Sequence, residues 1–239
     1  LLERMRENSM VISNEAEAIG QAFDAMVESR PALKPVMDAF KQIMVNREVL
    51  KATIAKLPDS SIPVPDEARL GEGYPWLNEE MVASLAESWG ENTASVLAVI
   101  ETVFPGIAAE VSRLKNALDS GKLEMKACIA AQVESSENDL QAMAASLDMP
   151  PRVLKFILGQ MLKPFIEGKV EHLGPMIQNI PWYHGYCPVC GAFPEVSYLK
   201  STEGQRWLRC SLCGHEWRFD RMTCPYCDNK NERRELLYV

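Results

Sequence analysis

The order of apolar and polar residues along the chain changes once, near residue 180. Before that point, apolar residues recur at intervals of three and four, as in amphipathic helices whose apolar stripes face a core. One such stripe is Val96, Val99, Ile100 and Val103. Another is Leu33, Val36, Met37, Phe40 and Met44. The pattern predicts a mostly α-helical domain over residues 1–180.

The last helix of this domain is expected to be its most buried one. Pro150 and Pro151 end a preceding helix, which opens near Ser136 as N-cap, and they start a run in which nearly every face is apolar. This run includes Val153, Ile157, Met161 and Phe165. A helix that is apolar all round belongs in a protein interior.

Residues 57–76 interrupt the helical pattern with four prolines and two glycines. We expect a long loop between helices, because these residues favour turns. It is either a surface connector or a lip that meets a partner, since long loops in compact domains are often functional.

From Pro181 onward the pattern predicts short strands. "EVSYLK" and "QRWLRC" flank the turn-like "STEG" and are expected to form a hairpin, while "HEWRF" and "RRELLYV" are further strand candidates. We therefore expect a small β module over residues 181–239, organised around metal.

Six of the seven cysteines stand in C-x-x-C pairs. The first two pairs are Cys187 with Cys190 and Cys210 with Cys213, and the 19 residues between Cys190 and Cys210 match the spacing of four-thiolate metal sites. Gly191 and Gly214 follow these pairs, where a knuckle turn often needs positive φ. No helical pattern follows either pair, as a thioredoxin-like redox site would need. We predict one site with four thiolates, for zinc or iron.

The third pair, Cys224 and Cys227, supplies half of a second site. Asp228 takes the place of the knuckle glycine and tolerates positive φ. His184 and His215 are candidates to complete this site, although each is more simply a residue that flanks a knuckle. We expect a fourth C-x-x-C beyond residue 239. The lone Cys128 is expected to be a buried helix residue.

Charge and composition exclude several protein classes. No segment has the roughly 18 consecutive apolar residues of a membrane helix, and the low cysteine density argues against a secreted disulfide scaffold. We expect a cytoplasmic protein. The net charge is −8, with 17 basic against 26 acidic residues up to residue 180 and eight against seven thereafter, which disfavours nucleic acid as partner. Three histidines and no nucleophile motif give little basis for an enzyme.

The stretch "YCPVCGAFPEVSYL", with "GQRWLRCSLCGHEWRFDRMTCPYC" after it, resembles the FdhE family of formate dehydrogenase accessory proteins. The resemblance implies a helical region followed by two rubredoxin-like modules with iron in their thiolate sites. It also implies a cytoplasmic protein that binds the catalytic subunit of a molybdenum- or tungsten-dependent formate dehydrogenase during its maturation or quality control. Cys187, Cys190, Cys210 and Cys213 are then the ligands of one site, and Cys224 and Cys227 half of the other.

Two alternative functions remain open at this stage. A zinc-ribbon nucleic-acid binder would use Arg206, Arg209, Arg218 and Arg221 with Trp207 or Trp217, although acidic residues alternate with these arginines. A rubredoxin-like electron carrier would use the iron itself. For contact with a client protein, the candidates are Trp217, Arg218 and Arg221, between two knuckles.

Overall fold

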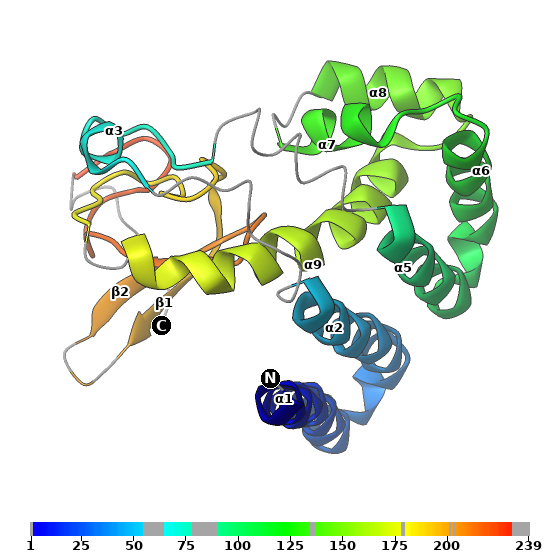
Figure 1. The fold of residues 1–239 in the computed structure, drawn as a ribbon, viewed down its shortest axis with the longest axis horizontal. Helices are drawn as coiled ribbons and strands as arrows, with labels where there is room; N and C mark the ends of the chain where they lie inside the picture. The colour runs from blue at the N-terminus through cyan, green and yellow to red at the C-terminus, as the bar shows by residue number, and fades with distance from the viewer. Residues whose placement is uncertain are drawn as a thin grey trace. The chain divides into compact units, whose positions relative to one another are not determined.

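The computed structural model describes residues 2–54, 65–77, 90–133, 137–177, 180–200, 202 and 204–230 (Figure 1). The chain divides into two compact units. The first unit comprises Leu1–Pro58 and Val82–Gly168, and the second comprises Asp59–Met81 and Lys169–Val239. The domain boundary expected at residue 180 stays a prediction, and the second unit takes in the end of the long helix before that residue and a segment from earlier in the chain.

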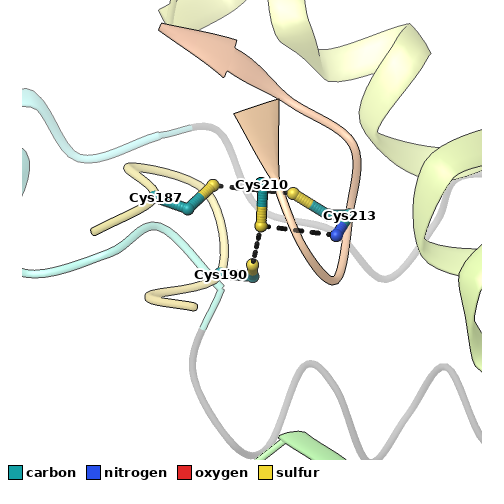
Figure 2. A group of neighbouring side chains, drawn as sticks. All are labelled: Cys187, Cys190, Cys210 and Cys213. Carbon is teal, nitrogen blue, oxygen red and sulfur yellow. Dashed lines mark hydrogen bonds between the residues drawn. The ribbon is translucent and has the colours of Figure 1, made fainter. Parts of the chain in front are cut away.

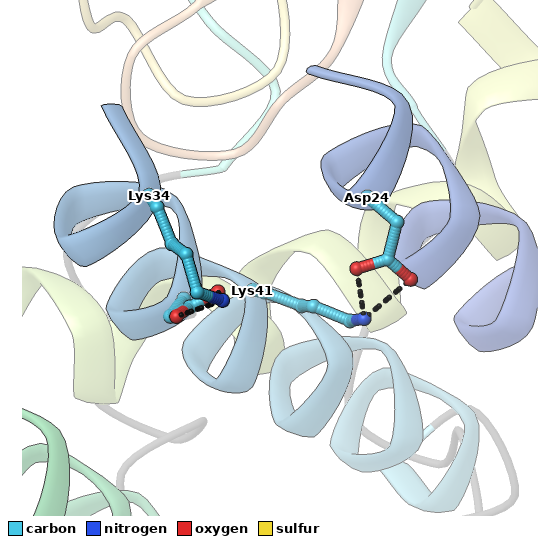
Figure 3. A network of polar contacts seen from close by, with 4 residues as sticks. Asp24, Lys34 and Lys41 are labelled. Atoms are coloured by element: carbon cyan, nitrogen blue, oxygen red, sulfur yellow. Dashed lines mark hydrogen bonds and ion pairs between the residues drawn. The ribbon is translucent and has the colours of Figure 1, made fainter. Parts of the chain in front are cut away.

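The first unit begins with a helical hairpin. Helix α1 (Leu2–Ser29) and helix α2 (Lys34–Ile54) are joined by the 3-10 turn Pro31–Leu33, and the two helices lie side by side (Figure 1). The Lys41 ammonium group lies 2.6 and 2.7 Å from the two carboxylate oxygens of Asp24, as Figure 3 shows. Exposed ion pairs of this kind contribute at most about 1 kcal/mol, so this pair adds little to the stability of the hairpin.

Helix α9 (Pro151–Ile177) supplies much of the buried core of the first unit. The helices before it are α5 (Gly90–Val103), α6 (Ala108–Asp119), α7 (Met125–Val133) and α8 (Glu137–Ser146), with the 3-10 turn Pro105–Ile107 between α5 and α6. The α9 side chains that are at most 1% exposed are Leu154, Ile157, Leu158, Met161, Leu162, Phe165 and Ile166. The prediction of a buried helix here is confirmed, whereas Ser136 lies outside the described residues.

The predicted apolar stripe from Leu33 to Met44 was expected to face a core, and this prediction is wrong for three of its five residues. Leu33, Val36 and Phe40 are 38, 52 and 36% exposed. Among the residues of α2 whose burial is described, the buried apolar ones are Ile43 and Leu50. Phe40 has an edge contact with Phe104, with ring centroids 5.7 Å apart. A helical repeat identifies the apolar face of a helix, but it does not supply another element to cover that face.

The second unit is built on a three-stranded antiparallel sheet. Strand β1 (Pro194–Lys200) pairs with β2 (Gln205–Cys210), and β2 pairs with β3 (Glu216–Arg218). The predicted hairpin and the strand at "HEWRF" are confirmed, and the candidate "RRELLYV" lies outside the described residues. The predicted fold class, a mostly helical region followed by a small zinc-ribbon-like module, is also confirmed.

Two further expectations concern individual helices. None of the described helices can cross a membrane alone by length and apolarity, although Thr93–Val103 and Pro105–Asp119, bent by 113°, pass this criterion together. Cys128 is buried in α7, as predicted, with its sulfur 3.9 Å from the sulfur of Met143. Burial raises the pKa of this thiol to about 12, so Cys128 is an unreactive core residue.

Candidate metal centre

The first cysteine pair lies in a tight turn that directs a backbone amide at a sulfur. Cys187 N donates a hydrogen bond to Ala192 O (2.9 Å), and Gly191 N donates to Cys187 O (2.9 Å). Val189 N donates to Cys187 Sγ at 3.4 Å. The turn needs φ of +77° at Gly191, a conformation that glycine adopts without steric cost.

The second pair repeats this turn at the end of β2. Cys210 N donates to His215 O (2.9 Å), and Gly214 has φ of +68°. Two amides, Leu212 N and Cys213 N, donate to Cys210 Sγ at 3.4 and 3.5 Å. Strands β2 and β3 lie on either side of the turn and pair with each other, so the hairpin that they form positions this knuckle.

The two knuckles bring four sulfurs together (Figure 2). All four Sγ atoms lie within 4.8 Å of one another, with Cys187 to Cys213 at 3.5 Å and Cys190 to Cys210 at 3.4 Å. A tetrahedral ion with sulfur ligands at about 2.3 Å places them roughly 3.7 Å apart. The arrangement therefore fits one metal ion, of either kind, and we call it the four-cysteine cluster.

Burial disfavours four thiolate anions in the cluster unless a cation is bound between them. Cys187, Cys210 and Cys213 are at most 1% exposed. Desolvation raises the pKa of Cys187 and Cys213 well above the usual range, whereas hydrogen bonds from the neighbouring thiols lower the pKa of Cys210. Four thiols so close together ionise jointly only if a cation replaces their protons, and this is the condition under which metal binding stabilises a small domain.

A segment from the middle of the chain supports the first knuckle. Trp76 N donates to Pro188 O (2.9 Å) and Leu77 N donates to Val189 O (2.7 Å). Both donors belong to buried residues. A Cβ added to Gly191 would meet Pro75 Cγ at 3.1 Å, so the close fit also favours glycine there.

The prediction of an uninterrupted loop over residues 57–76 is therefore wrong in its second half. Helix α3 (Glu67–Gly71) forms there, because the Asp66 carboxylate accepts hydrogen bonds from Ala68 N (2.9 Å) and Arg69 N (3.4 Å) as an N-cap. Tyr186 OH further donates to Gly73 O at 2.7 Å. This part of the segment supports the candidate metal centre, and residues 57–64 lie outside the described ranges. Asp66 at the N-cap position was a sequence signal for the helix, whereas no signal indicated the pairing with the knuckle.

The three residues expected to contact a client differ in exposure. Trp217 is 4% exposed and donates from Nε1 to His184 O at 3.3 Å, whereas Arg218 and Arg221 are exposed. His215 is stacked over Trp217, with ring centroids 6.5 Å apart, and burial lowers the pKa of this histidine to about 4. Trp217 thus packs the module internally, and client contact by these residues stays a prediction.

The third pair adopts the same turn without a second pair opposite it. Cys224 N donates to Asn229 O and Asp228 N donates to Cys224 O, each at 3.0 Å. Asp228 has φ of +51°, so the expected positive φ is confirmed. Backbone hydrogen bonds from Tyr226 and Cys227 lower the pKa of Cys224.

No complete second site forms within the described part of the chain. Cys224 is half-buried and Cys227 exposed, and no histidine, cysteine or carboxylate joins them in a group of three ligand atoms. The candidate ligand His184 instead stacks on Tyr186, with ring centroids 4.9 Å apart. The role of the third pair in a second site stays a prediction.

Neighbouring residues hold the third knuckle against the first. A Cβ on Gly185 would overlap the carbonyl group of Pro225, so the two backbones touch directly. The rings of Phe193 and Tyr226 stack with centroids 4.9 Å apart, and Tyr226 OH donates to Pro194 O (3.0 Å). The third knuckle is thus part of the same packed module as the cluster.

Comparisons with known proteins agree on one family. The family model described as "FdhE, central domain" matches residues 186–221, which include all four cysteines of the cluster and end before Cys224. A protein FdhE homolog of Aquifex aeolicus is 26% identical over 230 residues, which cover 93% of this chain and 74% of that protein. Protein FdhE of Escherichia coli O127:H6 is 43% identical over 49 residues, covering 20% of this chain and 16% of the relative.

A solved structure shares the fold. The crystal structure of the FdhE protein from Pseudomonas aeruginosa matches with a TM-score of 0.58 at 20% sequence identity. The match covers 92% of this chain and 71% of that one. The resemblance to the FdhE family is confirmed by these findings together.

Proposed function

We propose that this FdhE-like chain is a cytoplasmic accessory protein that binds the catalytic subunit of a formate dehydrogenase and assists its maturation or quality control. The observation that carries the proposal is the four-cysteine cluster, which lies inside the segment that matches the FdhE central domain. The names of the relatives identify the family, and the assignment of a client rests on the family resemblance.

The cluster supports a binding role better than a catalytic one. Catalytic metal sites keep a coordination position for water or substrate, whereas four protein thiolates fill a tetrahedral shell. A metal held by these four residues would join two knuckles that lie 20 residues apart or more in sequence. We infer that it stiffens the β module, and that the module presents a surface to the client.

We further propose that the cluster holds iron. Zinc and iron fit four sulfurs equally by geometry, so the proposal follows the rubredoxin-like character of the module. Metal content and the absorption spectrum of protein purified without oxygen distinguish the two metals. Ferric iron gives a visible sulfur-to-metal charge-transfer colour, whereas ferrous iron and zinc do not, so the spectrum is recorded before and after addition of a mild oxidant such as ferricyanide. Zinc in the metal analysis, with no colour after oxidation, would contradict this part of the proposal.

Co-purification tests the client. We expect the catalytic subunit to co-purify with the chain, and we expect Cys210→Ser to abolish this together with metal binding, while Cys128→Ser serves as a cysteine control. If the catalytic subunit does not bind, and deletion of the protein leaves formate dehydrogenase activity unchanged, the proposed function is wrong.

Of the two alternatives, the structure weakens the nucleic-acid binder. Two of its four arginines have partners within the module: Arg206 donates to Thr223 O (2.7 Å) and Ser197 Oγ (2.8 Å), and Arg209 lies 3.6 Å from Glu216. An electron carrier would use the same cluster, and a reversible potential of the iron would support it. We keep the electron carrier as a role that is compatible with client binding.

A further inference from the structure

A groove of about 920 Å³ crosses the second unit beside the four-cysteine cluster. Its walls come from the segment before the first knuckle, from β2 and β3, and from the residues around the third knuckle. The lining residues that matter here are Trp182, Tyr183, Arg218, Arg221 and Lys230. We call it the basic groove.

The basic groove carries more exposed cations than exposed acids. Arg218, Arg221 and Lys230 are exposed and form no ion pair within the described ranges. Two acids of the lining are already engaged. Glu216 pairs with Lys200 at 2.8 Å, and Asp220 accepts from Met222 N (3.0 Å) and Thr223 Oγ1 (2.9 Å). Asp228, the third acid, is exposed. The hydrogen bonds of Asp220 leave its charge in place, and Lys230 interacts with that charge. The exposed cations Arg218, Arg221 and Lys230 therefore outnumber the exposed acids Asp220 and Asp228 by one.

A hollow of about 440 Å³, whose lining is partly apolar and partly polar, adjoins the basic groove and shares residues 180–184 with it. Leu70 and Met176 line the hollow, and Tyr183 is 83% exposed at the shared wall. The wall is firm, because Trp182 is buried and donates from Nε1 to Tyr186 O at 2.7 Å. A large exposed aromatic side chain beside a hollow is typical of a residue that anchors a bound partner.

We propose that the two hollows together bind one extended polypeptide segment with an apolar side chain followed by acidic side chains. The apolar side chain packs against Tyr183 and Met176, and the acidic ones face Arg218 and Arg221, whose guanidinium groups bind carboxylates with two hydrogen bonds. The inference rests on the proposed function, since the client protein supplies the segment. Positive charge alone would also suit a nucleic acid, but the exposed side chains of Tyr183 and Met176 beside it favour a peptide with an apolar side chain.

The first test measures binding of fluorescein-labelled synthetic peptides to the full chain by anisotropy. The reference probe carries leucine and phenylalanine followed by glutamates. In one comparison peptide glutamines replace the glutamates, in another glycines replace the apolar pair, and an oligothymidylate serves as nucleic-acid probe. We expect the reference peptide to bind most tightly, and more weakly as salt concentration rises.

Variants of the chain locate the site. We expect the double substitution R218E with R221E to weaken the reference peptide on the order of tenfold, and Tyr183→Ala to weaken it several-fold. The matched control reverses two exposed charges outside the groove, at Arg152 and Lys155 on α9, and should leave affinity unchanged. Unchanged metal content shows that each variant is folded.

Equal binding of all peptides, tighter binding of oligothymidylate, or no effect of the groove substitutions would overturn the inference. The client experiment separates this failure from failure of the proposed function. If the catalytic subunit binds the parent chain and the double variant R218E with R221E equally, the function stands and the groove is not its site. If the catalytic subunit does not bind the parent chain at all, the proposed function itself fails. The groove then has no client protein to supply its peptide segment.

Discussion

The four-cysteine cluster and the third knuckle use one backbone turn in two different settings. In each, the amide of the leading cysteine donates to a carbonyl five residues later, and the residue after the second cysteine has φ between +51 and +77°. The cluster is buried by the sheet, by the segment around Trp76 and by a second pair, whereas Cys227 is exposed. Local sequence therefore encodes the turn, but only long-range packing brings two such turns together so that four sulfurs can hold one metal ion.

The largest expected effect comes from removing one ligand on each side of this comparison. We expect Cys210→Ser to abolish metal binding and to unfold the β module, because metal binding to a structural site of this kind contributes on the order of 10 kcal/mol to folding. Cys227→Ser should leave metal content per chain unchanged. Metal analysis and circular dichroism of both variants check this.

If Cys227→Ser loses as much metal as Cys210→Ser, the third knuckle also binds metal, contrary to what its geometry indicates. Ligands from a second copy of the chain, or from residues outside the described ranges, would then complete the site. Measuring the mass of the protein in solution separates these two explanations.

The next largest difference should be in cysteine reactivity, between the third knuckle and the buried Cys128 of α7. Cys227 is exposed and Cys224 has a lowered pKa, whereas burial raises the pKa of Cys128 from 9.0 to about 12. At pH 8 this shift leaves about a thousandfold less thiolate at Cys128 than at an ordinary cysteine. We expect iodoacetamide, followed by mass spectrometry of peptides, to label Cys227 and Cys224 first. Early labelling of Cys128 would show that α7 opens readily.

A smaller effect is expected where the third knuckle touches the first. Gly185→Ala places a methyl group against the carbonyl of Pro225, and overpacking of this kind costs roughly 1–3 kcal/mol. We expect a lower melting temperature and faster alkylation of Cys224, with metal content retained. Gly71→Ala is the matched control, because a Cβ there meets nothing within 4 Å. Loss of the metal in Gly185→Ala would mean that the third knuckle also supports the cluster.

The features that the sequence predicted correctly are the local ones. Strands β1 and β2, the buried helix α9, the knuckle turns and the positive φ of Asp228 all follow from residue types within a few positions of one another. The bonds from Trp76 and Leu77 to the first knuckle were missed, because backbone donors and acceptors leave no residue pattern. The α2 stripe was misjudged for a related reason, since apolarity at Val36 does not show whether another helix covers it.

The smallest expected effect concerns the residue that distinguishes the third turn from the other two. Asp228→Gly removes the cost of a left-handed conformation but adds entropy to the unfolded chain, and these terms, each about 1 kcal/mol, nearly cancel. We therefore expect a change in unfolding free energy below about 1 kcal/mol, measured by urea denaturation. A larger loss would mean that the carboxylate itself is needed, and since Asp228 also lines the basic groove, peptide affinity should then be measured in the same variant. Tighter binding of the acidic peptide by Asp228→Gly would show that this carboxylate opposes the charge of Arg218 and Arg221, which would make the third knuckle part of the surface that binds the peptide.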